Sequence, residues 1–488
     1  MNILFAASEA FPFIKTGGLG DVVHSLPIAL NKLGDSVRLV LPAYRDVLAS
    51  VDKQKVLATW DIPGVGVTHR VRVIQAHQDE LGDYLYLIDA PALFGRSGNP
   101  YVHSDGYSWP DNAERFTVFC RAVAMLALQV PGSQWKPDVV HAHDWQTGLV
   151  PAFLSQVPNP PKTVFTIHNL SYDGYYSRHE FDQLGLPAAW WSPDYLEFYG
   201  GFSMLKAGIV FSTHVTTVSP TYAKEICTPE FGYRYDGLLL SQGHKLSGIV
   251  NGIDLDVWNP ETDNSIAQNY TATKNRIGAK RANKKDLLNY VGMSESDAPL
   301  LGFIGRMVSQ KGIDLVTVIL PELFETSDAR MVVLGSGDRV YEADLQALAD
   351  KYPDRLHVHI GYSETLAHKI EAGCDMFLMP SRFEPCGLNQ MYSLRYGTPP
   401  IVNHTGGLAD TVTNTTLVTL RNKTANGFVF HGANSAALLS ITNSALQLFA
   451  NHRLWQQVCR TAMQKDLGWD ASAKEYQKLY MQNDEVAV

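Results

Sequence analysis

A carboxylate and a thiol stand close together in the segment Pro380–Gln390, which reads PSRFEPCGLNQ. Glu384 and Cys386 follow the apolar run Met376–Met379, which predicts a buried parallel strand, and they precede a segment that predicts a helix from Asn389. Open α/β sheets bind ligands just beyond the carboxyl ends of their strands. The sequence therefore places this carboxylate and this thiol where a substrate would meet them.

Two six-residue stretches of nearly the same sequence occur far apart in the chain, Thr16–Asp21 (TGGLGD) and Thr405–Asp410 (TGGLAD). Each is expected to join a strand to a helix. Glycines at such a turn let backbone N–H groups approach an anion, and the helix N-terminus adds partial positive charge. One such loop could be a plain tight turn, but two near-copies favour ligand contact. The residues predicted to take part are Gly17, Gly18, Asp21, Thr405, Gly406 and Gly407.

Two cations lie five residues apart in Gly305–Gly312, which reads GRMVSQKG. Arg306 and Lys311 follow the apolar run Leu300–Ile304 and lead into a predicted helix. The N-terminal end of a helix repels positive charge, so two cations there favour a bound anion. A diphosphate fits them, with arginine as a fork and lysine as a point charge. The alternative is a pair of solvated surface cations.

Histidines and an aspartate gather at the ends of two further predicted strands. His141, His143 and Asp144 belong to HAHDW, and His168 belongs to TIHN. Alternate residues of a strand point to the same side, so His141 and His143 could be paired metal ligands. No second ligand cluster accompanies them, which favours Asp144 and His168 as hydrogen-bonding partners of substrate hydroxyls. Tyr362, after the run LHVHIG, could stack on a flat ring or be an ordinary half-buried tyrosine.

These residues need a scaffold in which strands alternate with helices. A strand over Asn2–Ala7, a helix over Asp21–Leu33 closed by Gly34, and a strand over Ser36–Leu41 make a β-loop-α-β unit. A second alternating series begins at Leu300. Such alternation predicts parallel, doubly wound sheets. The predicted fold class is therefore α/β, with two doubly wound domains.

The pattern of the chain resets over Leu246–Asn259, where Asn251-Gly252 is a turn signal. We expect a first domain over residues 1–245, a second over 246–455 and C-terminal helices over 456–488. In that last segment Trp469–Tyr480 has helical spacing, with Trp469, Ala473, Tyr476 and Tyr480 on one face. The simplest interpretation is a helix that packs on a core.

Composition excludes several classes of protein. The chain of 488 residues has a net charge of −9 and no block of lysine and arginine, which argues against a nucleic-acid or anionic-membrane partner. No apolar run approaches the roughly 20 residues that span a bilayer. The N-terminus lacks a basic region and predicts a strand, so neither a signal nor a transit peptide is expected. Five scattered cysteines without a C-x-x-C pair favour a reduced, cytoplasmic protein.

The motifs, taken together in their order and spacing, resemble those of bacterial glycogen synthases and plant starch synthases. They are KTGGLGD, HAHDW, TIHN, SPTYA, NGID, GRMVSQKG, RFEPCGLNQ and HTGGLAD. The resemblance covers nearly the whole chain and implies a GT-B fold, in which two Rossmann-like domains face a deep cleft and a C-terminal helix crosses back to the first. It implies transfer of glucose from ADP-glucose to the non-reducing end of an α-1,4-glucan such as glycogen, with retention of configuration and without a metal or other cofactor.

The resemblance also implies roles for single residues. Lys15 corresponds to a lysine that binds the nucleotide sugar, and Arg306 and Lys311 correspond to residues that hold the diphosphate. Glu384 corresponds to a carboxylate that faces the glucose, with Cys386 beside it.

In the same way, Asp144 and His168 correspond to residues near the anomeric centre and the acceptor. Asn251 and Tyr362 correspond to donor contacts with the sugar and the base. The wider family of two-Rossmann transferases has a second glutamate eight residues after the first, where this chain has Tyr392. The synthases share this absence, so a second carboxylate on that helix has no role.

A mechanism follows from the predicted charges. Breaking a glucose–diphosphate bond puts negative charge on the leaving group, and Lys15, Arg306 and Lys311 can stabilise it. No nucleophile is paired with a general acid, as a two-carboxylate hydrolase would require. We therefore expect front-face transfer, in which the departing phosphate takes the proton of the acceptor.

Three alternatives stay open. A nicotinamide-dependent oxidoreductase would have the same kind of fold, but the G-x-G-x-x-G fingerprint with its acidic partner is missing. A non-catalytic glucan-binding protein would not need the set of Arg306, Lys311 and Glu384. A UDP-sugar transferase is the nearest alternative, because no residue distinguishes adenine from uracil on physical grounds.

Overall fold

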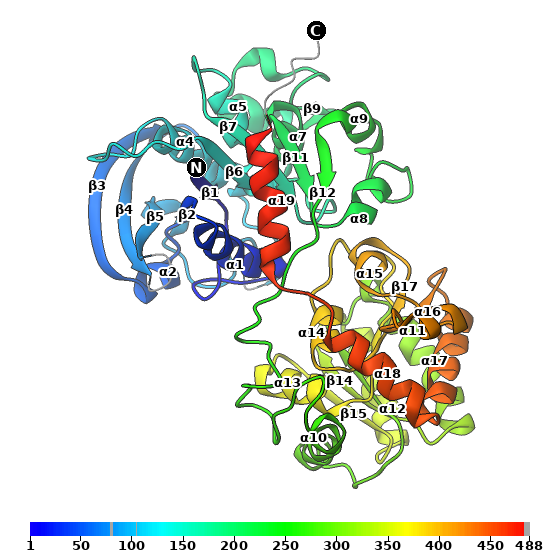
Figure 1. Ribbon diagram of the computed structural model, residues 1–488. Helices are drawn as coiled ribbons and strands as arrows, with labels where there is room; N and C mark the ends of the chain where they lie inside the picture. The colour runs from blue at the N-terminus through cyan, green and yellow to red at the C-terminus, as the bar shows by residue number, and fades with distance from the viewer. Residues whose placement is uncertain (79–81, 104, 483–488) are drawn as a thin grey trace. The chain divides into compact units, whose positions relative to one another are not determined.

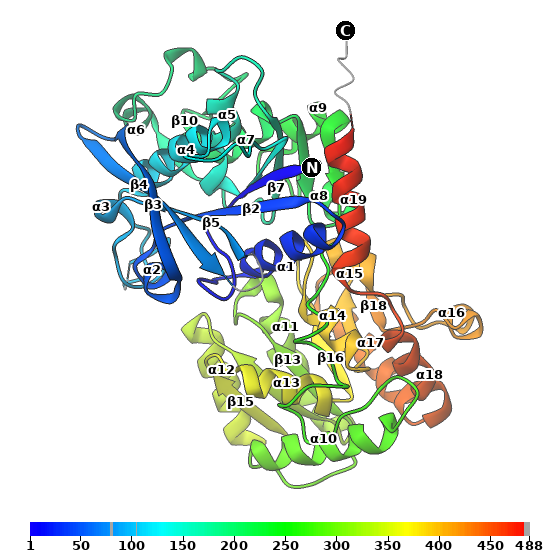
Figure 2. The same ribbon diagram turned by 60° about the vertical axis from the view of Figure 1, so that its left-hand side comes forward.

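The computed structural model describes residues 1–78, 82–103 and 105–482, which form two units (Figures 1 and 2). Unit 1 comprises Met1–Gly252 together with the C-terminal segment that begins at Trp469, and unit 2 comprises Ile253–Gly468. Each unit has its own parallel sheet and its own hydrophobic core. None of the helices in the described ranges is both long and apolar enough to cross a membrane.

The main sheet of unit 1 has the strand order β12-β11-β7-β6-β1-β2-β5-β4-β3. The strands are β1 (Asn2–Ala6), β2 (Ser36–Pro42), β3 (Asp52–Pro63), β4 (Thr68–Gln78), β5 (Gly82–Asp89), β6 (Val139–His143), β7 (Lys162–Ile167), β11 (His214–Thr217) and β12 (Leu246–Gly248). All neighbours from β12 to β5 are parallel, whereas β4 and β3 extend the edge in antiparallel fashion. A second, three-stranded antiparallel sheet has the order β8 (Tyr175–Ser177), β10 (Gly201–Ser203), β9 (Glu197–Phe198).

Helices cover both faces of the main sheet of unit 1. The helices of unit 1 are α1 (Gly18–Lys32), α2 (Arg45–Ser50), α3 (Pro91–Phe94), α4 (Asn112–Leu128), α5 (Leu149–Leu154), α6 (Arg178–Gln183), α7 (Met204–Phe211), α8 (Pro220–Glu225), α9 (Asp236–Ser241) and α19 (Trp469–Met481). The helices α1 and α19 lie on one face, and α4, α5 and α7 lie on the other (Figure 2). Covering both faces explains why the parallel strands are apolar on both sides.

Unit 2 has a six-stranded, all-parallel sheet with the order β15-β14-β13-β16-β17-β18. Its strands are β13 (Leu300–Ile304), β14 (Arg330–Gly335), β15 (Leu356–Ile360), β16 (Met376–Met379), β17 (Pro400–Asn403) and β18 (Phe428–Phe430). Its helices are α10 (Arg276–Tyr290), α11 (Ile313–Thr326), α12 (Arg339–Lys351), α13 (Glu364–Gly373), α14 (Asn389–Arg395), α15 (Gly406–Thr411), α16 (Leu417–Asn422), α17 (Ser435–Phe449) and α18 (His452–Met463). The expected α/β class with two Rossmann-like units is confirmed.

The division of the chain differs from the expected segments 1–245, 246–455 and 456–488. The chain stays in unit 1 through β12, which pairs in parallel with β11, and it leaves that unit at Gly252. The helix α18 spans the expected second boundary and belongs to unit 2, where Trp455 stacks on Phe428 at 6.0 Å. Sequence periodicity shows that α18 has an apolar face, but it does not show which core that face covers.

The last helix, α19, belongs to unit 1. Trp469, Ala473, Tyr476 and Tyr480 are all buried, as their spacing on one face predicts, and the helix packs against α1. The Tyr480 hydroxyl lies 2.8 Å from Nδ1 of His141 in β6. An aromatic stripe and a buried hydrogen bond thus attach the C-terminal helix to the central strands of unit 1.

Candidate active site

The loop after β16 carries the candidate carboxylate of unit 2. Glu384 is 5% exposed, and its Oε2 accepts hydrogen bonds from Lys311 Nζ at 2.6 Å and from Ser381 Oγ at 2.9 Å. Lys311 ends the 3₁₀ turn Ser309–Lys311 that follows β13 and precedes α11. Because β13 and β16 are parallel neighbours, both loops leave the same edge of the sheet. The structure thus brings together a lysine and a glutamate that are 73 residues apart.

Arg306 also lies at this edge, directly after β13. Its side chain is exposed, and one guanidinium nitrogen donates to Gln310 Oε1 at 3.1 Å. Gln310 in turn donates to the Phe383 carbonyl at 3.4 Å, beside Glu384. Neither Gln310 nor Ser381 could be singled out from the sequence. Neutral polar residues in loops carry no spacing signal, and only the tertiary contact shows that they orient charged ones.

The second glycine loop approaches the carboxylate loop from β17. Gly407 donates its backbone N–H to the Glu384 carbonyl at 3.1 Å. A Cβ at Gly406 would lie 1.9 Å from the Glu384 carbonyl oxygen, and one at Gly407 would lie 2.0 Å from that of Cys386. Thr405, in extended backbone, is the N-cap residue of α15. These glycines are therefore needed for close contact between two loops, and the Gly407 amide is already bonded to protein.

The remaining residues predicted in unit 2 differ in their surroundings. Cys386 is 5% exposed, and its carbonyl accepts a hydrogen bond from Gln390 at 3.0 Å. Tyr362 follows the edge strand β15 and is 83% exposed, so it is not the half-buried tyrosine of the alternative interpretation. Its hydroxyl donates to Glu364. Its predicted contact with a nucleobase stays a prediction.

In unit 1 the first glycine loop is fixed by hydrogen bonds to the carboxylate of a buried glutamate. Thr16 donates both its backbone N–H and its hydroxyl to the carboxylate of Glu9, the latter at 2.7 Å. Glu9 is 3% exposed. Lys15 is exposed and pairs with Asp21 of α1 at 2.8 Å. Glu9 could not be identified from the sequence, because a single acidic residue after a strand carries no pattern of its own.

The two glycines of this loop start helix α1. Gly17 is its N-cap residue and has extended backbone, and Gly18 is its first residue. The predicted helix Asp21–Leu33 therefore begins three residues earlier than expected. The apolar residues Val22, Val23 and Leu26 face the core, as their spacing predicts.

Asp144 and His168 meet where β6 and β7 end. Asp144 Oδ1 accepts the backbone N–H of His168 at 2.7 Å, and the Asp144 N–H donates to Thr166 at 2.9 Å. Asp144 has φ of 57°, an uncommon conformation for a residue other than glycine. Burial raises the pKa of Asp144 to about 7, whereas it lowers the pKa of His168 to about 3. At neutral pH His168 is therefore a neutral imidazole, which can donate and accept hydrogen bonds without carrying charge.

The surroundings of His141 and His143 bear on the metal alternative. His141 has both ring nitrogens in hydrogen bonds, to Tyr480 at 2.8 Å and to Thr166 at 2.6 Å. His143 Nδ1 lies 3.0 Å from His168 Nε2. A ring with both nitrogens hydrogen-bonded has no lone pair left for a metal, so His141 is a structural residue. Within the described ranges, no group of three or more histidine, cysteine, aspartate or glutamate side chains could hold a metal ion.

Asn251 lies at the end of unit 1 and is 6% exposed. Its side-chain oxygen is buried and has no hydrogen-bond partner among the described residues. Leaving a buried amide oxygen unpaired costs about 1–3 kcal/mol, which a ligand hydroxyl or N–H would offset. The predicted contact of Asn251 with the donor sugar stays a prediction.

Comparison with known proteins gives matches over both units. Residues 2–241 match the family model described as starch synthase catalytic domain, and residues 291–452 match the model described as glycosyl transferases group 1. The chain is 51% identical to a glycogen synthase of Hydrogenovibrio crunogenus, over 98% of this chain and 99% of that protein. It is 48% identical to glycogen synthase 2 of Nitrosococcus oceani, over 99% and 97%.

Solved structures agree with these matches. The catalytic domain of starch synthase IV from Arabidopsis thaliana, bound to ADP and acarbose, superposes with a TM-score of 0.87 at 32% identity, over 98% of both chains. Sucrose-phosphate synthase from Thermosynechococcus elongatus superposes with a TM-score of 0.60 at 18% identity, over 98% of both chains, which is a likeness of fold alone.

Two α/β units of this kind, with charged residues at the carboxyl ends of their parallel strands, define a glycosyltransferase of the GT-B class. The relatives that match over nearly the full length of the chain narrow this class of glycosyltransferases to one family. The chain belongs to the glycogen and starch synthase family and is a hexosyltransferase.

Proposed function

We propose that this chain elongates an α-1,4-glucan by transferring glucose from ADP-glucose to its non-reducing end, with retention of configuration. The observation that carries the proposal is the contact of Lys311 with Glu384, beside Arg306, at the carboxyl ends of β13 and β16. This is the edge at which open α/β sheets bind ligands. The solved starch synthase bound ADP and acarbose, which supports a nucleoside diphosphate and a glucan as ligands of this relative.

In the proposed reaction, the bond between glucose C1 and the β-phosphate oxygen breaks, and a bond forms between C1 and the 4-hydroxyl oxygen of the acceptor. The electron pair of the broken bond stays on the departing ADP, and the acceptor proton passes to its phosphate. Arg306 and Lys311 supply positive charge where negative charge develops, which is the largest catalytic effect available to this site. The reaction needs no metal or cofactor in this proposal, because the protein itself supplies the cations.

Unit 1 supplies the neutral polar groups. His168 stays uncharged at neutral pH because burial lowers its pKa, so it can bond to sugar hydroxyls without repelling the positive charge that develops on the sugar. The Asp144 carboxylate fixes the backbone of His168 through its 2.7 Å hydrogen bond. In this proposal Asp144 is a positioning residue for His168.

The proposal includes a location of the protein in the cytoplasm. All five cysteines are free, and four of them are buried, which fits a reducing cytoplasm.

One experiment tests the activity and the nucleotide together. The purified protein is incubated with glycogen and either ADP-glucose or UDP-glucose, and both nucleotide release and glucan lengthening are measured. We expect ADP release with matching chain growth, and much slower transfer from UDP-glucose. Faster transfer from UDP-glucose would replace the donor in the proposal, and nucleotide release without chain growth would overturn glucan synthesis.

A further inference from the structure

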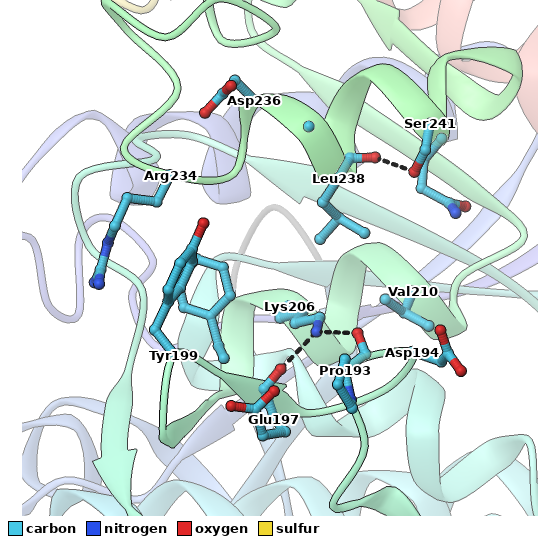
Figure 3. Close-up of a pocket in the computed structure, with 13 residues that line it drawn as sticks. Pro193, Asp194, Glu197, Tyr199, Lys206, Val210, Arg234, Asp236, Leu238 and Ser241 are labelled. Carbon is cyan, nitrogen blue, oxygen red and sulfur yellow. Dashed lines mark hydrogen bonds between the residues drawn. The ribbon is translucent and has the colours of Figure 1, made fainter.

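Buried polar groups of proteins are normally hydrogen-bonded within the protein. Lys206 on α7, in the wall of a cavity of about 680 Å³ in unit 1, shows this: it is 5% exposed, and its Nζ donates to the backbone carbonyls of Pro193 and Glu197, the latter at 2.6 Å (Figure 3). His143, at the end of β6, differs from Lys206. Its side chain is fully buried, and only one of its two ring nitrogens has a hydrogen-bond partner among the described residues.

His143 lies in the middle of a row of three imidazole rings. The centre of its ring is 4.1 Å from that of His141 on the same strand and 5.3 Å from that of His168, which directly follows β7. The ring of Phe5 in β1 packs against His143 at 5.1 Å. The strands β1, β6 and β7 are parallel neighbours in the centre of the sheet. Close packing of this kind holds a buried ring in one orientation, so His143 is a rigid partner for His168.

The hydrogen bond between His143 Nδ1 and His168 Nε2 is 3.0 Å long and contains one proton. Burial lowers the pKa of both imidazoles, so each ring is neutral at neutral pH and has one N–H group and one bare nitrogen. Either His143 donates from Nδ1 or His168 donates from Nε2. The direction of this bond therefore decides whether the other nitrogen of His168 is a donor or an acceptor for a ligand.

The buried Nε2 of His143 indicates the direction. If His168 were the donor, His143 would carry its proton on Nε2, and this N–H would be buried with no acceptor in the part of the chain that the structure describes. Buried N–H groups without an acceptor are rarer in proteins than buried acceptors without a donor. The favoured arrangement thus leaves Nε2 of His143 bare and places the proton on its Nδ1, from which it is donated to His168.

We propose that His143 is a positioning residue that fixes the tautomer of His168: its Nδ1–H donates to Nε2 of His168, so that His168 presents an Nδ1–H group to a hydroxyl oxygen of the sugar substrate. This rests on the proposed function for the nature of the substrate. Asp144 fixes the backbone of His168, and His143 fixes its ring. A donor that is already in place need not be selected when the substrate binds.

The first measurement is of the tautomer itself. Long-range proton–nitrogen spectra of the full chain, labelled with nitrogen isotope in its histidines, distinguish a ring nitrogen that carries a proton from a bare one. They are recorded at neutral pH without any ligand, and signals are assigned by their loss in single-histidine variants. We expect the proton on Nδ1 and a bare Nε2 in both His143 and His168. A proton on Nε2 of His168 would overturn the proposal.

A matched pair of variants then separates the donated proton from the packing of the ring. His143→Asn places an amide N–H near the position of Nδ1 and can still donate to His168, whereas His143→Gln places its amide near the position of Nε2 and removes this donor. We expect His143→Gln to lose the single tautomer of His168 and to lower kcat/KM for ADP-glucose roughly tenfold, the effect of about one hydrogen bond. His143→Asn should keep the tautomer and lower kcat/KM by roughly threefold at most.

The control is His214→Gln in the same sheet. His214 is the first residue of β11 and so lies at the amino end of that strand, whereas His143 and His168 lie at the carboxyl ends of theirs. Its substitution should leave kcat/KM and the tautomer of His168 unchanged. Equal losses in His143→Asn and His143→Gln with an unchanged tautomer would assign His143 to packing alone, and a wild-type tautomer and kcat/KM in His143→Gln would show that the donated proton has no role; either result overturns the proposal.

The two proposals fail separately, because the spectra are recorded without substrate. If the wild-type chain shows the expected tautomers but transfers no glucose, the proposed activity falls and the fixed tautomer of His168 stands. If the chain transfers glucose and His168 carries its proton on Nε2, only the positioning role of His143 falls. The unfolding temperature of each variant is measured, and if both His143 variants unfold, the spectra of the wild type decide.

Discussion

Lys311 and Arg306 differ in their partners within the protein, because only Lys311 is paired with a carboxylate. We infer different roles for the two residues from this difference. Lys311 is paired with the buried carboxylate of Glu384 at 2.6 Å, whereas the exposed Arg306 is bonded to the neutral amide of Gln310. A diphosphate would have to share Lys311 with Glu384. Arg306 retains its full charge for the ligand, and its planar fork suits two phosphate oxygens. We therefore expect Arg306 to be the stronger stabiliser of the leaving group.

The first prediction concerns Arg306→Ala. Removing the cation should lower turnover by roughly 10²–10³-fold, as the loss of one preorganised charge partner of a transition state does. The measurement is kcat at saturating ADP-glucose and glycogen. The control is Arg421→Ala, which removes an exposed arginine from α16 and should leave kcat unchanged. Turnover near the wild-type value in Arg306→Ala would remove leaving-group stabilisation from the mechanism.

The second prediction concerns Lys15→Ala. Lys15 pairs with Asp21 on the surface, and an exposed pair contributes little to stability, so the variant should unfold at the wild-type temperature. Its predicted role is to bind the donor, and the KM for ADP-glucose should rise more than kcat falls. Steady-state kinetics over a range of donor concentrations measure both. A donor KM equal to that of the wild type would count against this role.

At the scale of single residues, the charged residues that follow apolar strands in unit 2 could be predicted, and the residues that orient the ligand loops could not. Glu384, Lys311 and Arg306 stand in loops after apolar strands, and the structure places all three at one sheet edge, as that pattern predicts. Ser381 and Glu9 became visible only through contacts with residues distant in sequence or through their burial. Such contacts depend on which loops lie next to each other, and this is determined by the tertiary structure.

On the scale of elements, α14 carries Tyr392 at the position where the wider family of two-Rossmann transferases has a second glutamate, and its packing explains the replacement. Tyr392 stacks on Trp258 at 3.9 Å between ring centres, and Trp258 stacks on His368 of α13 at 4.1 Å. A glutamate at position 392 would lose this aromatic contact. The side chain that replaces the carboxylate therefore serves to join α14 and α13 through Trp258.

The third prediction concerns the pH dependence of this stack. Burial alone would lower the pKa of His368, but hydrogen bonds and charge from Asp263 and Glu364 outweigh it and raise the pKa to about 9. The folded pKa exceeds the ordinary value of about 6.5, so the stabilisation is complete below pH 6.5 and is lost as the pH rises through 9.

In urea titrations, wild-type unit 2 should therefore lose up to about 3 kcal/mol of unfolding free energy between pH 6 and pH 10 that His368→Gln does not lose. The difference between the two proteins at each pH is the quantity to measure, because other groups titrate equally in both. Parallel pH profiles for the two proteins would show that folding does not shift the pKa of His368.

Helices and strands could be predicted where a clear pattern of apolar residues lay between turn residues such as glycine and proline. The strands β13 and β16 are short apolar runs that are followed by glycine or proline, and the structure confirms both of them. The strand β3 was missed, because in Asp52–Pro63 most side chains are exposed or half-buried and the run lacks an apolar core. The strands β8, β9 and β10 have two or three residues each, too few for any period to appear.

On the scale of the whole molecule, the chain builds two cores and returns to the first one only with its last helix. The core of unit 1 includes Trp469, Ala473, Tyr476, Leu479 and Tyr480 of α19, so this core is completed by residues more than 200 positions beyond the rest of it. The core of unit 2 contains Trp455 and Cys459 of α18, and it is continuous without α19. The stability of unit 1 should therefore depend on the C-terminal helix, and that of unit 2 should not.

The fourth prediction tests this dependence by ending the chain after Gly468. Loss of α19 uncovers apolar surface on α1 and leaves His141 without the Tyr480 hydroxyl, whose hydrogen bond is worth about 1 kcal/mol. Hydrogen exchange followed by mass spectrometry should show lost protection in peptides from α1 and β6, with unchanged protection in peptides from β13 and β16. A Tyr480→Phe variant of the full chain removes the hydroxyl alone, and it should show a smaller loss in β6 than the truncation does. Equal loss of protection in both units after truncation would mean that α19 does not belong energetically to unit 1.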